Sequence, residues 1–352
     1  MSLESLIEDK RVVVCVGVGG VGKTTLGAAL ALASARRGKK TLCLTVDPAR
    51  RLAQSLGLES IDVDEVTVDT AWMKEHGTEI SGSLTVMMLD AAKTFDELVI
   101  KNAPQPKVAQ SILDNRIYRH LSRNVAGTQA YMAMEKVQAV DAERRYDLIV
   151  LDTPPGERAL DFFDAPERMR EILDSPATRA LSRVSRVASG AKFGLLQQGF
   201  KGLVRTLGKV TGGDFIDELS TLLLLLRDLF GGFTERADRI SARMRSADFG
   251  YLLVTAPHAL TLGQADELAR ELAARGLRVD ALAINRVTPD PGQLPSLDDV
   301  LASDVGRTLG LDADEGERVL AAAREAALDA QREHARVEET ATARAIDLPT
   351  RL

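Results

Sequence analysis

The residues best suited to chemistry occupy one short stretch, VCVGVGGVGKTTLGAA at residues 14–29. Residues 17–24 match the pattern G-x-x-x-x-G-K-S/T, whose glycines let the backbone wrap around phosphates with its N–H groups turned inward. In this pattern Lys23 supplies charge to the phosphates, and Thr24 offers its hydroxyl to Mg²⁺. We therefore predict a site for a nucleoside triphosphate. The predicted cradle consists of Gly19, Gly20, Val21, Gly22, Lys23, Thr24 and Thr25.

Two aspartates that end apolar runs are candidates for the remaining chemistry. Asp152 closes the run in YDLIVLDTPPG at 146–156, and beside a phosphate loop it is the expected acid of the metal shell. Taken alone, it could equally cap the turn that follows. Asp47 closes TLCLTVD at 41–47, where it could orient or deprotonate an attacking water. An Asp-Pro pair is also found in ordinary turns at strand ends.

A parallel sheet is needed to bring these residues together. RVVVCVG at 11–17 and TLCLTVD at 41–47 flank a helix-like segment rich in alanine and leucine. Strand, loop, helix and strand within about 35 residues form a βαβ unit, and nearly continuous apolar strands favour a sheet covered on both faces. We predict a doubly wound, mostly parallel α/β fold. Further strands are predicted at 83–89, 146–152, 249–255 and 279–285, and a helix at 262–276 that ends at Gly276.

The strand pattern is interrupted between residues 157 and 247, where we predict an all-helical insertion. One apolar stripe recurs there every three or four residues, and a second helix at 215–233 is apolar on more than one face. Two interpretations stay open, because these helices could pack inside the protein or expose a surface for a partner. The stripe consists of Phe193, Leu196, Phe200, Leu203, Leu207 and Val210.

Composition limits the class of protein. The 45 basic and 51 acidic residues give a net charge of -6, which argues against general nucleic-acid binding. Cys15 and Cys43 lie in apolar strands and are expected to be reduced core residues. The longest apolar run, 222–226, is far shorter than the roughly 18 residues of a membrane span. With no secretory signal visible either, we expect a cytoplasmic protein without stable membrane insertion.

These segments resemble, in the same order, the ATPase family that contains the arsenite-pump ATPase ArsA and the targeting ATPase for tail-anchored membrane proteins. With MinD and ParA, that family belongs to the deviant P-loop group. AKTFDELV at 92–99 and NRIYRHLS at 115–122 are similar to a bacterial branch. The resemblance is strongest in GGVGKTT (phosphate loop), DPARRLAQSLG (first switch), DTPPGERALDFFDAP (second switch) and TAPHALTLGQADELARELAARGLRVDALAINRV (C-terminal part of the nucleotide site).

The resemblance implies one P-loop ATPase domain over 8–352, with the insertion at 157–247 and a loose tail at 335–352. ATP and Mg²⁺ are the implied cofactors, held in part by Thr24 and Asp152. The family pattern makes Lys23 and Asp47 the catalytic residues, with Asp47 beside the attacked phosphate. It also places Asn285 against adenine. Pairing with a second copy or a related subunit is expected, with a hydrophobic client at the insertion.

Three departures from the family pattern open alternatives. Val18 stands where the family carries a lysine that reaches the partner's phosphates. A related subunit could supply the lysine, Arg50 or Arg51 could replace it, or hydrolysis could be slow. The family's zinc-binding CxxC and arsenite-binding cysteines are missing, so an arsenite role is not expected. The insertion is also not rich in methionine. A client-handling ATPase and a regulatory or positioning ATPase of the MinD/ParA type both stay open, and a metabolic kinase is a more distant third.

Overall fold

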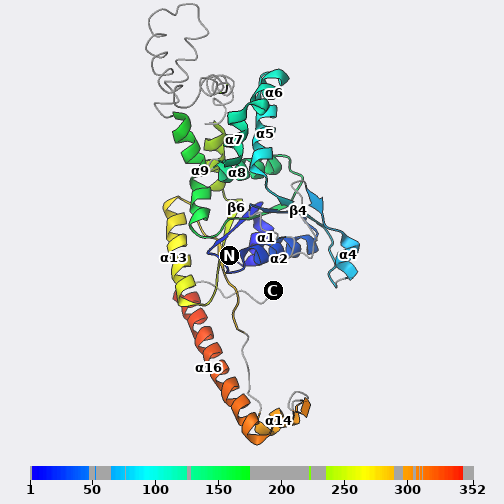
Figure 1. Ribbon diagram of the computed structural model, residues 1–352, viewed down its shortest axis with the longest axis vertical. Coiled ribbons are helices and arrows are strands. Elements are labelled where there is room, and N and C mark those ends of the chain that lie inside the picture. Colours follow the sequence, from blue (N-terminus) through cyan, green and yellow to red (C-terminus); the bar gives the residue numbers. More distant parts are fainter. Residues whose placement is uncertain are drawn as a thin grey trace, which may run out of the picture.

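The computed structural model describes residues 2–46, 52, 65–75, 77–124, 128–174, 222, 235–288, 296–303, 307–308, 310 and 312–343. Within these residues lies one seven-stranded sheet of order β3-β4-β2-β5-β1-β6-β7 (Figure 1). Neighbouring strands are parallel, except that β3 runs antiparallel to β4. The strands are β1 (Val12–Gly17), β2 (Lys40–Thr45), β3 (Val66–Thr67), β4 (Ser83–Met88), β5 (Leu148–Asp152), β6 (Phe249–Thr255) and β7 (Ala281–Ile284).

The sheet confirms the predicted doubly wound α/β fold. Each of the six predicted runs holds a strand, and the helix predicted at 262–276 is α13 (Ala259–Ala274). Gly276 follows the C-cap Arg275 with a left-handed φ of 72°, as expected for a residue just past a helix end. Sequence reasoning missed β3, because two residues at a sheet edge carry no detectable periodicity.

The strands are apolar because helices cover both faces of the sheet. Val12, Val14 and Val16 of β1 pack in one core cluster, and the alternate residues Val13 and Cys15 pack in another, as the two-residue period of a strand requires. The second cluster is closed by α1 (Leu3–Asp9), α2 (Lys23–Arg36) and α4 (Thr70–Glu75). The first is closed by α13, by helical residues 235–244 and by the helices described next.

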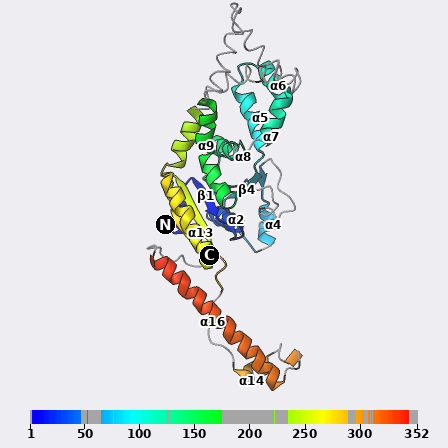
Figure 2. The ribbon, with the colours of Figure 1, turned by 60° about the vertical axis from the view of Figure 1, so that its left-hand side comes forward.

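A helical region lies at one end of the molecule, and two stretches of sequence build it (Figures 1 and 2). Between β4 and β5 come α5 (Ala91–Asn102), α6 (Pro106–Asp114), α7 (Arg116–Asn124) and α8 (Thr128–Ala142). Between β5 and β6 come α9 (Glu157–Asp174) and residues 235–244. The helices after β4 had not been predicted, so the insertion at 157–247 does not build the helical region alone.

Much of the predicted insertion lies outside the described residues. The stripe from Phe193 to Val210 is not described, and of the predicted helix at 215–233 only Leu222 is, which is helical and 1% exposed. Both interpretations of those apolar faces, internal packing and a partner surface, therefore stay open. Among the described helices, none combines the length and apolarity needed to cross a membrane.

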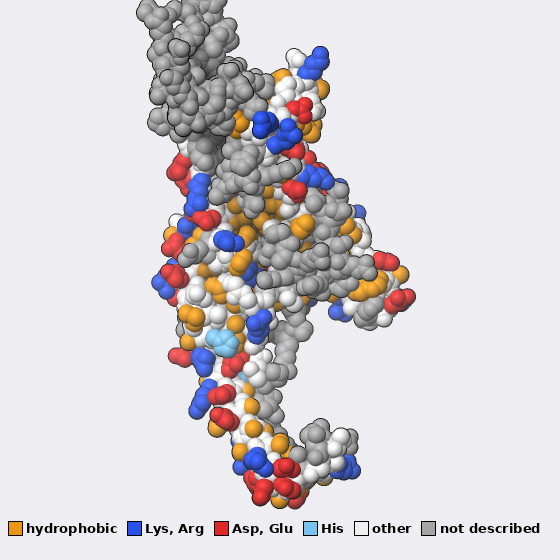
Figure 3. All heavy atoms as spheres, viewed as in Figure 1, with side chains coloured by type: hydrophobic (Ala, Val, Ile, Leu, Met, Phe, Trp, Pro, Cys, Tyr) orange, Lys and Arg blue, Asp and Glu red, His pale blue; other side chains and the backbone are white. Residues whose placement is uncertain are grey.

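The opposite end of the molecule carries α14 (Leu297–Ala302) and α16 (Ala313–Ala343), which extend away from the sheet (Figures 1 and 2). Acidic side chains gather where these two helices meet (Figure 3). The carboxylate of Asp312 accepts a hydrogen bond from the Glu315 N–H at 2.8 Å and so caps the start of α16. The helix continues past residue 335, where the sequence predicts a loose tail, and residues 344–352 lie outside the described part.

Two buried acids on α8 fasten residues 235–244 to the rest of the fold. Glu135 accepts a hydrogen bond from Arg236 at 3.2 Å. Asp141 accepts from Arg243 at 2.8 Å and from Arg11 beside β1 at 3.0 Å. A buried carboxylate needs such partners, because removing it from water is costly. Asp141 therefore links α8, the start of β1 and the segment that leads into β6.

We expect Asp141→Ala to destabilise the protein by about 2 kcal/mol, because it leaves the guanidinium groups of Arg11 and Arg243 without their shared carboxylate. Both arginines are about a quarter exposed, so the loss should fall below that of a fully buried pair. Glu143→Ala is the control, since Glu143 is half exposed and pairs only with Arg145 among the described residues; it should cost less than about 0.5 kcal/mol. Urea unfolding measures both, and equal losses would contradict the prediction.

Candidate active site

The stretch from Gly17 to Lys23 forms a tight loop between β1 and α2. Gly20 and Gly22 have left-handed φ angles of 77° and 93°, which residues with a Cβ adopt only at a cost. At Gly17, a Cβ would lie 2.2 Å from the carbonyl oxygen of Val254 on β6. The loop therefore needs glycine at these positions, both for its backbone angles and for its contact with the neighbouring strand.

The loop presents donors to an anion. Within the described part of the chain, no acceptor pairs with the backbone N–H groups of residues 19–22, and α2 begins directly after them at Lys23. The first N–H groups of a helix lack partners within the helix, and its N-terminus carries partial positive charge. This arrangement suits phosphate binding.

Lys23 lies over the loop that precedes it. Lys23 is 7% exposed, and its Nζ donates a hydrogen bond to the carbonyl oxygen of Val18 at 3.1 Å. A charge on a largely buried side chain interacts strongly with an anion, because little water screens it. The structure thus brings the predicted lysine to the predicted cradle.

Asp152, at the end of β5, is the centre of the polar contacts beside this loop. It is 1% exposed, and its Oδ2 accepts hydrogen bonds from the Thr24 hydroxyl at 2.8 Å and the Thr45 hydroxyl at 3.1 Å. A carboxylate and a hydroxyl side by side are the oxygen ligands that Mg²⁺ prefers. The residues present therefore fit a magnesium ion beside the phosphate cradle.

The loop after β5 is tied to the loop after β1. The Thr153 hydroxyl donates to the Cys15 carbonyl oxygen at 2.8 Å, and the Gly156 N–H donates to the Gly17 carbonyl oxygen at 3.1 Å. Pro155 faces Gly19, where an added Cβ would lie 3.8 Å from the proline ring. The second-switch sequence therefore contacts the phosphate loop directly, and α9 begins at the next residue, Glu157.

Asn285 reaches the site from the end of β7, the edge strand of the sheet. It follows β7, and its side-chain Nδ2 donates to the carbonyl oxygen of Val21 at 2.8 Å. A Cβ on Gly22 would lie 2.2 Å from that nitrogen. The predicted base-contacting residue thus packs on the phosphate loop, at the edge where ligands of parallel α/β sheets bind.

The match to known proteins agrees with this geometry. The model of the ArsA-type, anion-transporting ATPase family matches residues 10–299. The chain belongs to this family. The predicted resemblance is therefore confirmed, and the protein is an ATPase that binds a nucleotide.

Among relatives of this ArsA-family ATPase, an ATPase get3 from Aspergillus terreus is 25% identical over 294 residues, or 81% of this chain and 76% of the relative. An ATPase get3 from Pyrenophora tritici-repentis is 24% identical over 291 residues, covering 81% and 77%. An uncharacterized protein from Streptomyces coelicolor is 28% identical over 283 residues, covering 80% and 63%.

The remaining predicted residues of this ArsA-family ATPase differ in what the structure shows. Thr25 is exposed on the first turn of α2, while Val21 is 2% exposed and packs in the core. Asp47, Arg50 and Arg51 lie outside the described residues, so their roles stay predictions.

Two threonines of the site were not foreseen. Thr45 ends β2 and lies opposite Asp152 in the parallel ladder, and Thr153 follows Asp152. Both are hydroxyl residues at the carboxyl ends of predicted strands, which was the available signal. Their spacing in the sequence does not reveal the contact, because the order of the strands sets it.

The cysteines of this ArsA-family ATPase do not belong to its polar site. Cys15 and Cys43 are both fully buried and free, as the sequence predicts. Burial, reinforced by the negative charge of Asp152, raises the pKa of the Cys15 thiol far above its ordinary value. The same two causes raise the pKa of Cys43, so both remain neutral thiols of the core.

We expect Gly22→Ala to weaken ATP binding at least about tenfold, because its Cβ must displace Asn285 from the loop. Gly38→Ala is the matched control: Gly38 has a similar φ of 89°, and an added Cβ there meets no atom within 4 Å. Both variants pay the backbone cost of a left-handed alanine, but only the first disturbs the site. Calorimetric titration with ATP and Mg²⁺ compares them, and equal affinities would contradict the prediction.

Proposed function

We propose that this ATPase hydrolyses ATP with Mg²⁺ and uses the reaction to switch its helical region between states that bind and release a protein partner or a hydrophobic client. The observation that carries this proposal is the hydrogen bond from the Gly156 N–H to the Gly17 carbonyl oxygen at 3.1 Å. It joins the phosphate loop to the segment that leads straight into α9. The phosphate loop is therefore hydrogen-bonded to the residue immediately before α9.

In this proposal the phosphates of ATP lie on residues 17–25. Lys23 neutralises charge that develops on the transferred phosphoryl group, and Thr24 and Asp152 would hold the metal. A Mg²⁺ ion held there would supply positive charge that stabilises the phosphates. Asp47, outside the described residues, would orient the water for in-line attack. Asn285 would contact the adenine base.

The switch follows from a competition for one donor. For the Gly156 N–H to bind the γ-phosphate, it must leave the carbonyl oxygen of Gly17. Because α9 starts at Glu157, that movement shifts the first turn of the helix. Further along α9, Asp164 pairs with Arg275, the C-cap residue of α13, at 2.7 Å. Loss of the γ-phosphate would return the loop to Gly17 and relax the helical region.

A second function, a regulatory or positioning ATPase paired with a related subunit, is favoured by Val18. The side chain of Val18 packs at the edge of the core, and its carbonyl oxygen accepts the hydrogen bond from Lys23. No cation extends from this position toward a partner's phosphates, so a partner subunit could supply one.

A cytoplasmic location is supported by the two buried, free cysteines.

We expect Lys23→Ala to lower the steady-state ATPase rate at least about 100-fold, because the transferred phosphoryl group loses its charge partner. The control is Lys74→Ala, since Lys74 lies exposed on α4 and pairs only with an exposed glutamate among the described residues. Unchanged hydrolysis in Lys23→Ala would contradict the assigned role.

The solution mass with ADP and with a non-hydrolysable ATP analogue plus Mg²⁺ tests the pairing. A dimer formed only with the analogue would show that pairing works without a lysine at position 18. A monomer with negligible hydrolysis would favour the second function, in which a related subunit completes the site.

We further expect hydrogen exchange at 157–174 to differ between the analogue and ADP, because Gly156 changes its acceptor. Residues 3–9 of α1, which lie away from the second switch, serve as the internal control and should exchange equally in both states. Identical exchange at 157–174 would contradict the switch while leaving the ATPase function intact.

A further inference from the structure

Two adjacent residues of the long C-terminal helix α16 bind Thr288, which follows β7. Glu333 on α16 accepts the Thr288 N–H at 2.6 Å and the Thr288 hydroxyl at 3.1 Å. The neighbouring His334 donates its Nε2 hydrogen to the Thr288 carbonyl oxygen at 2.8 Å, since a carbonyl can only accept. Every polar group of Thr288 is thus held by two adjacent residues of α16. We call these three residues the α16 clasp.

The clasp lies three residues from Asn285, which contacts the phosphate loop. Between them Arg286 has a φ of 60°, a left-handed angle that is unfavourable for a residue with a Cβ. Such a turn persists when its surroundings hold it in place. Asn285 is fixed on one side by its backbone hydrogen bond to Thr255 at 2.8 Å. The clasp fixes the chain on the other side.

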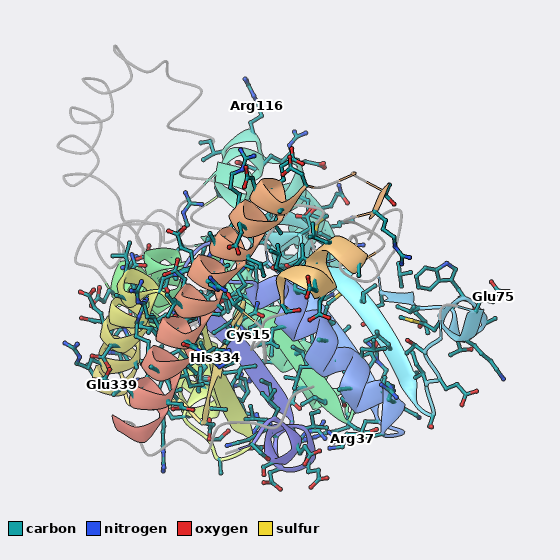
Figure 4. All side chains as sticks on the ribbon, turned by 90° about the horizontal axis from the view of Figure 1, so that it is seen from below. Cys15, Arg37, Glu75, Arg116, His334 and Glu339 are labelled. Atoms are coloured by element: carbon teal, nitrogen blue, oxygen red, sulfur yellow. The ribbon has the colours of Figure 1, made fainter. Side chains whose placement is uncertain are left out.

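α16 also reaches the loop after β6. The Arg336 guanidinium donates to the Pro257 carbonyl oxygen at 3.4 Å. Both loops follow the carboxyl ends of parallel strands, at the same edge of the sheet as the phosphate loop. Figure 4 shows His334 on the side of α16 nearer the strands and Glu339 on the outer side. One turn of α16 therefore spans the two loops beside the nucleotide site.

The clasp adds polar contacts to the apolar packing of α16. α16 already buries the apolar Val337, which is 7% exposed, one turn further on. A carboxylate that accepts from an N–H and a hydroxyl of the same residue fixes orientation as well as distance, because hydrogen bonds to charged acceptors are short and directional. Such contacts suit the positioning of the chain that follows β7.

We propose that Glu333 is a positioning residue for the nucleotide base, holding the loop that presents Asn285 and so setting affinity and selectivity for adenine. This inference rests on the proposed contact between Asn285 and adenine. Because coupling between sites is reciprocal, a bound base also stabilises α16 against the loop. The arm formed by α14 and α16 is thereby linked to occupation of the site.

The test compares binding of ATP, GTP and inorganic tripolyphosphate, each with Mg²⁺, by calorimetry. Glu333→Ala should weaken ATP binding about tenfold and reduce the preference for ATP over GTP, while tripolyphosphate, which has no base, changes less than about twofold. Glu333→Gln should retain most of the affinity, because its amide oxygen still accepts the Thr288 N–H. Glu339→Ala, exposed on the same helix, is the matched control and should bind all three ligands as the wild type does.

Two other results separate the possible failures. If folded Glu333→Ala keeps the wild-type affinities and selectivity, the clasp serves stability alone and the proposal is wrong. If Asn285→Ala also leaves base selectivity unchanged, the base lies elsewhere and the proposed contact fails with it.

If Glu333→Ala does not fold, Thr288→Val is the test variant, because it removes only the hydroxyl contact. An ATP affinity reduced about threefold would support the proposal, and an unchanged one would overturn it.

Discussion

The buried carboxylate of Asp152 is the constraint on which the site depends. One of its oxygens accepts from Thr24 on α2 and from Thr45 on β2, so three elements that are distant in sequence meet at one atom. A carboxylate removed from water must be compensated by donors. Both donors reach it only when β1, β2 and β5 lie in their observed register, with Asp152 beside Cys15 and Thr45. A shift by one residue would turn the carboxylate to the other face of the sheet.

From this point the molecule extends in two directions. The loop after β5 passes from Asp152 to Gly156 and into α9, which belongs to the helical region. The loops after β6 and β7 contact α16, which extends toward the opposite end (Figure 1). Both extensions begin at the carboxyl edge of the sheet, where the phosphate loop lies. In the proposed function, a change at the nucleotide would reach either end through the hydrogen-bonded residues that follow these strands.

The helical region is held to the sheet by charge as well as by apolar packing. Glu135 and Asp141 of α8 pair with Arg236 and Arg243, two turns apart on the segment that enters β6. Broken pairs at such buried positions are costly, because each leaves a charge without compensation. These contacts favour movement of α8 and residues 235–244 as one body. The start of α9 is joined to the phosphate loop through the hydrogen bond between Gly156 and Gly17, so we place the proposed change of state there.

The sequence by itself determined the family, the parallel strands and the phosphate loop. Those features are local, since consecutive residues encode a glycine-rich turn between an apolar strand and a helix. Asp152 was found for the same reason, as the acid that ends a strand. Asn285 was placed only through the resemblance, because nothing near it in sequence points to the phosphate loop.

The tertiary structure decided what depends on strand order and on helix contacts. Thr45 became a partner of Asp152 because β2 and β5 are neighbours in the sheet, an order that no local pattern records. The helices after β4 were missed, since their mixed apolar and charged residues gave no reason to group them with the insertion. The clasp of Glu333 and His334 on Thr288 joins residues 45 and 46 positions apart. Such contacts follow from the path of the whole chain, because only folding brings their donors and acceptors within reach.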